Sequence, residues 1–138
     1  AAYHLSPRRQ WLTQVHGLLR PGGRLAYTDL VLDGQRAGSP WLRRAARACG
    51  VPWDDQADAD GQHDRLLQTG FTDVTLLRMD DAVLGGFAGH VRRQSLRLGT
   101  AALGAAWRRP LATALLIPPC RAAGLGYALW SARKPPAA

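Results

Sequence analysis

With 138 residues, 46% of them hydrophobic, the chain is long and apolar enough for one folded domain, which excludes a disordered protein. Its longest apolar run, residues 111–117, ends at Pro118-Pro119 and falls far short of the ~20 residues of a membrane-spanning helix. The formal net charge of +8 raises nucleic acid as a partner, but the arginines are scattered and no recognition motif accompanies them, so we interpret them as solvated helix faces.

The first predicted elements are a helix and a strand joined by a glycine turn. Ser6-Pro7 is a typical helix start, and apolar side chains repeat at helical spacing over residues 11–19. Pro21 blocks further helix, and the two glycines after it can take the positive φ of a tight turn. Residues 24–32 are almost continuously apolar, which predicts a strand covered on both faces. Such a unit is typical of parallel α/β sheets.

The middle of the chain repeats this pattern. A polar loop over residues 33–40 precedes a short helix over 41–49, and an acidic connection over 54–60 precedes a helix over 61–69. A second strand is predicted over 71–79, where β-favouring apolar residues follow a glycine. Because helices separate the two strands, we expect them to be parallel neighbours, or nearly so, joined by a right-handed crossover.

Two further helices and a last strand follow. Helical spacing predicts helices over 81–98 and 101–117, with interruptions at Pro110 and Pro118-Pro119. Residues 125–133 predict the closing strand.

Cysteine and histidine spacing points to no metal site. Cys49 and Cys120 stand far apart, so we expect two reduced, buried thiols in a cytoplasmic protein. His16, His63 and His90 show no ligand spacing, and we interpret them as structural or solvated. The N-terminus shows no signal peptide.

Four segments in this order resemble one enzyme family. They are Tyr3-His4 before the first helix, residues 18–25 at the Pro-Gly-Gly turn, residues 70–74, and residues 126–135. Together they resemble the C-terminal half of class I S-adenosylmethionine-dependent methyltransferases. The resemblance implies an α/β fold: the C-terminal half of a Rossmann-like sheet, with three strands, the last one antiparallel, and a helical insertion before the last strand. That insertion is similar to the one in tocopherol-type small-molecule methyltransferases.

The chain departs from the family in what it lacks. No Gly-x-Gly-x-Gly loop follows a first strand, and no acidic residue ends a second strand. The chain also begins with Ala rather than Met, and its first helix–strand unit has no strand before it. We therefore expect residues 1–138 to be a partial methyltransferase domain without the cofactor-binding half. The resemblance implies S-adenosylmethionine as cofactor of the parent enzyme, with no cofactor-binding residue in this chain and no activity of the chain alone.

Three residues are candidates for the methyl-acceptor site. His4 would follow the family's fourth strand, where a base could deprotonate a hydroxyl or carbon acid; the alternative is packing or hydrogen bonding in a loop. Tyr3 would contact the cofactor or the acceptor, or be an ordinary half-buried aromatic residue. Asp29 lies toward the carboxyl end of a strand, where a buried carboxylate must reach water and substrate or be hydrogen-bonded.

The helical insertion over residues 80–124 is too long for a simple strand connection. We interpret it as a lid over an apolar acceptor, with Phe87 and Trp107 as substrate-binding candidates; the alternative for both is a role in the core.

Three functional hypotheses remain open from the sequence. The first is a fragment of a methyltransferase that acts on a small, apolar acceptor. Under this hypothesis the protein has no nucleic-acid partner and does not insert stably into a membrane. The second is a non-catalytic half-domain that binds another chain, and the third is a basic nucleic-acid-binding module. We also expect self-association, since the strand over residues 24–32 would expose an apolar edge. The kind of atom that accepts the methyl group stays open.

Overall fold

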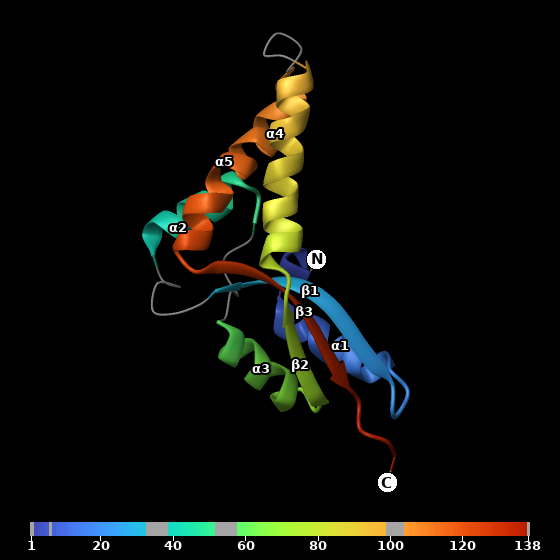
Figure 1. Ribbon diagram of the computed structural model, residues 1–138. Helices are drawn as coiled ribbons and strands as arrows, with labels where there is room; N and C mark the ends of the chain where they lie inside the picture. Colours follow the sequence, from blue (N-terminus) through green and yellow to red (C-terminus); the bar gives the residue numbers. More distant parts are fainter. Residues whose placement is uncertain (1, 6, 33–38, 52–57, 99–103, 138) are drawn as a thin grey trace.

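The computed structural model describes residues 2–5, 7–32, 39–51, 58–98 and 104–137 (Figure 1). Ser6, the loop 33–38 and the connection 54–57 lie outside the described residues. η1 and η5 are short 3-10 helices, and η3 is a π-helical turn. The elements, in chain order, are η1 Ala2–His4, α1 Arg8–Leu18, β1 Arg24–Leu32, α2 Pro40–Ala48, α3 Ala59–Gln68, β2 Thr72–Arg78, η3 Asp81–Gly85, α4 Gly86–Leu98, η5 Ala105–Trp107, α5 Arg108–Ala122 and β3 Leu125–Arg133.

The last strand, β3, lies at the centre of a three-stranded sheet of order β1-β3-β2 and is antiparallel to both neighbours. Its register with β1 is continuous, from Arg24 opposite Arg133 to Leu32 opposite Leu125. The strands β1 and β2 therefore run in the same direction, as expected, and β3 lies between them. Burial explains the order: every second side chain of β3 is buried, whereas β2 is mostly exposed and suits an edge.

Helices α1 and α3 pack against the sheet and build the main core. Leu12 of α1 and Leu66 of α3 pack with Val31, Phe71 and Trp130, and all five side chains are buried. Each large apolar side chain buried in this way contributes about 1.5–3 kcal/mol. Helices α1 and α3 lie in the lower part of Figure 1, away from α4 and α5.

The remaining helices pack at the carboxyl end of β1. Leu32 contacts Leu42 of α2, while Leu30 packs with Leu84 of η3 and Ile117 of α5. Helices α4 and α5 form a hairpin that projects away from the sheet, and α2 lies beside the base of α5 (Figure 1). Among the described helices, none is both long and apolar enough to cross a membrane.

Helix α5 continues through Pro118-Pro119, so the interruption expected there is wrong. Proline lacks the N–H that would bond to the carbonyl four residues earlier, which costs helix stability. Ile117 and Cys120, on either side of the proline pair, are buried against the sheet and α2, and this packing holds the helix together. Pro110 lies in the first turn of α5, where no N–H partner is needed.

Side chains and tail residues complete the helix ends. The carboxylate of Asp58 accepts a hydrogen bond of 2.7 Å from the Gly61 amide, which starts α3 earlier than expected. At the end of α1, the Lys134 Nζ donates to the carbonyl oxygens of His16 and Leu19, at 2.7 and 2.8 Å. The segment after β3 thus ties down the first helix.

Candidate functional site

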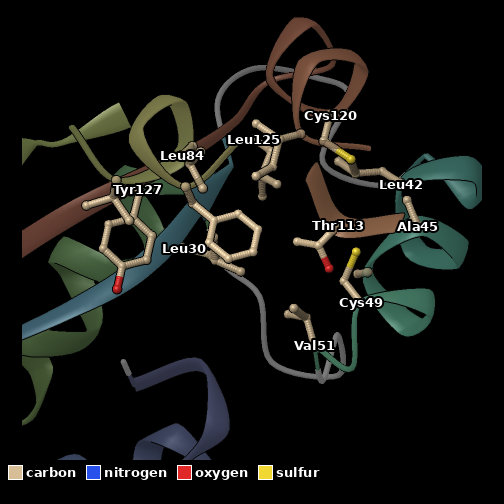
Figure 2. A pocket seen from close by; sticks show the side chains of 14 residues that line it. Leu30, Leu42, Ala45, Cys49, Val51, Leu84, Thr113, Cys120, Leu125 and Tyr127 are labelled. Carbon is tan, nitrogen blue, oxygen red and sulfur yellow. The ribbon is translucent and has the colours of Figure 1, made fainter. Parts of the chain in front are cut away.

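A cavity of about 280 Å³ lies where the carboxyl end of β1 meets α2, α5 and the start of α4 (Figure 2). Its walls come from four separate parts of the chain, and almost all of the exposed wall is apolar. Such a cavity excludes water from its contents and suits an apolar molecule. The large lining side chains are Leu30, Leu42, Leu84, Phe87, Ile117 and Leu125.

Few polar groups line this cavity. The Tyr127 hydroxyl donates to, or accepts from, the Thr28 hydroxyl at 3.0 Å, and Thr113 brings a further hydroxyl from α5. The thiols of Cys49 and Cys120 also line the wall, as Figure 2 shows. Burial, and then the neighbouring Cys49, raises the pKa of the Cys120 thiol, so Cys120 is a neutral wall residue rather than a thiolate nucleophile.

Two aspartates fix the π-helical turn that forms one wall. The Asp80 carboxylate accepts hydrogen bonds from the Arg78 Nε at 2.9 Å and from the Tyr127 amide at 2.5 Å. Asp81 pairs with the Arg121 Nη2 at 2.6 Å, which ties η3 to α5. Because η3 carries Leu84, these contacts position that side chain against the cavity. Turns of this kind are frequent at functional sites.

Asp29 lies next to the cavity wall but is engaged in the core. It is fully buried, its Oδ1 accepts a 3.0 Å hydrogen bond from the Arg8 Nη2, and the Leu30 amide donates to the same oxygen at 2.9 Å. Its Oδ2 is buried without a hydrogen bond among the described residues. Burial raises the pKa of Asp29, while the Arg8 charge opposes this shift. The adjoining Leu30 carbonyl accepts a hydrogen bond from Gln62 at 3.0 Å.

The other candidates from the sequence lie in different places. Phe87 lines the cavity and is 39% exposed, at the start of α4. His4 is exposed on η1 and is outside the cavity lining, and so is Trp107 on η5. Tyr3 belongs to η1, but its side chain lies outside what the structure describes. The structure thus brings Phe87 to the cavity and Asp29 beside it, and their roles stay predictions.

The sequence did not indicate that α2 and Tyr127 line the cavity. From α2, Leu42, Ala45 and Cys49 face the cavity at helical spacing, and from α5 Thr113 and Ile117 do the same. This periodicity is visible in the sequence, but it identifies only a buried face. That two buried faces from distant segments enclose a space depends on tertiary packing.

The described residues place few charged groups at this cavity. The cavity wall has no carboxylate, and the nearby Asp29 is bound to Arg8. The glycines with positive φ (Gly22, Gly50, Gly70 and Gly124) follow helices and do not form a strand–loop–helix cradle. In the described part of the chain, no group of three or more His, Cys or Asp side chains could hold a metal.

The sheet and its helices form an α/β fold that is shared with solved methyltransferases. Phosphoethanolamine N-methyltransferase 2 from Haemonchus contortus, solved with S-adenosyl-L-methionine, superposes with a TM-score of 0.78 at 15% identity. The match covers 98% of this chain and 31% of that one. The cyclopropane synthase MmaA2 from Mycobacterium tuberculosis gives a TM-score of 0.67 at 13% identity, covering 91% of this chain and 49% of that one.

The same fold also occurs in the [4+2]-cyclase SpnF, with a TM-score of 0.61 at 22% identity, over 99% of this chain and 47% of SpnF. The chain therefore spans about a third to a half of the structures it matches. No family model and no curated protein sequence matches it. At these identities the likeness establishes the fold, and the fold class expected from the sequence is confirmed.

Proposed function

We propose that this chain is the acceptor-binding part of an S-adenosylmethionine-dependent methyltransferase whose acceptor is small and apolar. The observation that carries the proposal is the apolar cavity of about 280 Å³ at the carboxyl end of β1, within a fold shared with such enzymes. Ligands of open α/β sheets bind outside the carboxyl ends of the strands, which is where this cavity lies.

The proposal assigns the chain's two parts different tasks. Residues 1–138 are a partial domain, and the insertion over residues 80–124, which contains η3, α4 and α5, is a lid that walls the acceptor cavity. Methyl transfer from a sulfonium centre needs mainly proximity, orientation and exclusion of water, and an apolar wall supplies the last two. Within this proposal the methyl donor is held by residues outside this chain, whose sequence has no Gly-x-Gly-x-Gly loop. We therefore propose that the isolated chain is inactive.

Within this proposal, Phe87 contacts the acceptor and closes the cavity mouth. His4, at the start of the described chain beside β1, would act as base where the acceptor is a hydroxyl or carbon acid. Tyr3, Asp29 and Trp107 are further substrate-contact candidates from the sequence. A cytoplasmic location belongs to the same proposal and is supported by the two free thiols, Cys49 and Cys120.

Filling the cavity tests the acceptor-site proposal. Ala46 of α2 lines the cavity, so Ala46→Phe should remove the space without exposing the core. We expect wild-type protein to bind naphthalene, measured by solution NMR shifts of cavity residues, and Ala46→Phe to bind it at least ten-fold more weakly. The matched control is Ala48→Phe, which places the same ring on the exposed side of α2.

Equal binding by Ala46→Phe and wild type would contradict an acceptor site in this cavity. Methyl transfer itself is tested on the chain joined to the protein encoded immediately upstream of it, with radiolabelled S-adenosylmethionine and apolar acceptors. If the joined protein binds S-adenosylmethionine but Ala46→Phe leaves the KM for the acceptor unchanged, the cavity is not the acceptor site. If it neither binds S-adenosylmethionine nor transfers a methyl group, the fold serves another function, as in the cyclase neighbour.

A further inference from the structure

The net positive charge of this chain comes from its last part. All ten acidic residues are aspartates, and none of them follows Asp81. From residue 82 onward the chain has eight basic residues and no acidic one, which accounts for the whole formal net charge of +8. The basic residues are scattered along the chain, as expected, but the aspartates that offset them all lie in its first part.

Most of this charge lies on the projecting hairpin of α4 and α5. Exposed arginines occupy the outer half of α4 and the first turn of α5, and neither helix contains an acidic residue. Because α4 and α5 leave the sheet together, their charged ends lie far from the aspartates of α3 and η3 (Figure 1). Besides Arg121, which pairs with Asp81 at the base of the hairpin, the hairpin arginines are Arg92, Arg93, Arg97, Arg108 and Arg109.

An apolar groove lies between α4 and α5, next to Arg92. It has a volume of about 600 Å³ and is lined by Leu96, Leu111 and Leu115 together with Arg92. Leu96 is 78% exposed and Leu115 is 75% exposed, values unusual for large aliphatic side chains on one surface. Arg108 shares a helical face with Leu111 and Leu115, at three- and seven-residue spacing, so charge and apolar surface alternate across the hairpin.

We infer that the α4–α5 hairpin docks on the surface of a membrane that contains anionic lipids. Exposed leucines insert between lipid headgroups while arginines beside them bind lipid phosphates, which is the recognised combination for surface-bound amphipathic helices. The half-buried Trp107, at the start of α5, is suited to the same interface. A nucleic acid would bind the arginines but offers no surface that buries Leu96 and Leu115. Docking of this kind needs no membrane-spanning helix, and it is independent of the proposed methyl transfer.

The test is co-sedimentation of the chain with vesicles. We expect binding to an equal mixture of phosphatidylcholine and phosphatidylglycerol, reduced by high salt, and little binding to phosphatidylcholine alone. The variant Arg92→Gln/Arg97→Gln/Arg108→Gln should bind roughly 100-fold more weakly, since each arginine at an anionic surface contributes about a factor of five. The matched control, Arg43→Gln/Arg44→Gln/Arg47→Gln, removes three exposed arginines from α2 and should bind nearly as wild type.

A second variant tests the apolar contribution. Leu96→Gln/Leu115→Gln changes two exposed side chains, so circular dichroism should show an unchanged fold. We expect this variant to bind the vesicles more weakly than wild type and to lose all binding at high salt. Wild-type protein should keep part of its vesicle binding at high salt, because the leucines still contribute.

Three results would overturn the inference. One is equal loss of binding in the hairpin variant and the α2 control, which would show that net charge alone matters. Another is binding that does not depend on phosphatidylglycerol, or no binding at all. The third is that duplex DNA displaces the protein from vesicles and that DNA binding is lost in the hairpin arginine variant. This result would make the hairpin a nucleic-acid site.

Discussion

The pair of Arg8 and Asp29 is the most consequential interaction of single residues in this structure. Both side chains are buried, and they join α1 to β1 beside the cavity wall at Leu30. The sequence predicted that Asp29 needs a partner but could not identify Arg8, because the two residues are 21 positions apart and belong to different elements. Only the packing of α1 against β1 brings them together.

Removing the Asp29 carboxylate should destabilise the fold. Asp29→Ala leaves the buried Arg8 charge without this carboxylate and should lower the free energy of unfolding by roughly 3–5 kcal/mol. Replacing both partners with apolar residues, Arg8→Met/Asp29→Leu, should restore it to within about 1 kcal/mol of wild type. Urea denaturation of Asp29→Ala, of the single variants Arg8→Met and Asp29→Leu, and of the double variant measures this. Additive losses in the double variant would contradict a coupled pair.

At the scale of elements, the turn from α3 to β2 depends on a glycine. Gly70 has φ +100°, and a Cβ there would lie 3.2 Å from the His16 Nε2. That imidazole packs edge-on against the Phe71 ring, with ring centroids 4.9 Å apart. The glycine therefore serves both the backbone turn and the packing of α1 on β2.

We expect Gly70→Ala to destabilise the protein more than Gly50→Ala. Gly50 also has a positive φ, of +72°, but a Cβ there meets no atom within 4 Å. The Gly50 variant thus measures backbone strain alone, about 1–2 kcal/mol, and the Gly70 variant adds the displacement of His16. Thermal unfolding followed by circular dichroism compares the two. Equal shifts in melting temperature would show that the His16 contact carries no energy.

The elements themselves were largely predictable, and their arrangement was less so. The bounds of β3 are those expected from residues 125–133, because alternating apolar residues and a preceding glycine are local signals. The continuation of α5 through Pro118-Pro119 was not predictable, since Ile117 and Cys120 hold that helix by contacts with distant residues. The cavity has the same origin: helical spacing showed apolar faces on α2 and α5 but not that they enclose a space.

At the scale of the whole molecule, the sheet ends at β1. Within the described residues, β1 pairs with β3 along its length, and its only further bridge joins Leu32 to Asp58. An apolar edge strand of nine residues is a template for pairing with another chain. This arrangement favours the self-association expected from the sequence and is also compatible with a half-domain that binds a partner chain.

A charge placed on this edge should reduce self-association. Ala26 is an exposed residue of β1, and lysine is the residue that natural edge strands use against pairing. Sedimentation velocity should show a larger monomer fraction for Ala26→Lys than for wild type. Ala48→Lys, which adds the same charge on α2, should behave as wild type. A chain that is already monomeric at high concentration would contradict the prediction.

The central position of β3 also determines when the sheet can form during synthesis. The strands β1 and β2 have no hydrogen-bonded contact with each other, and both pair only with residues 125–133 in the sheet. While a ribosome is still translating the hairpin, the nascent chain therefore has helices but no β-ladder to complete. A premature stop codon between β2 and Leu125 removes every strand pairing of the sheet at once, even though two of its three strands have already been made.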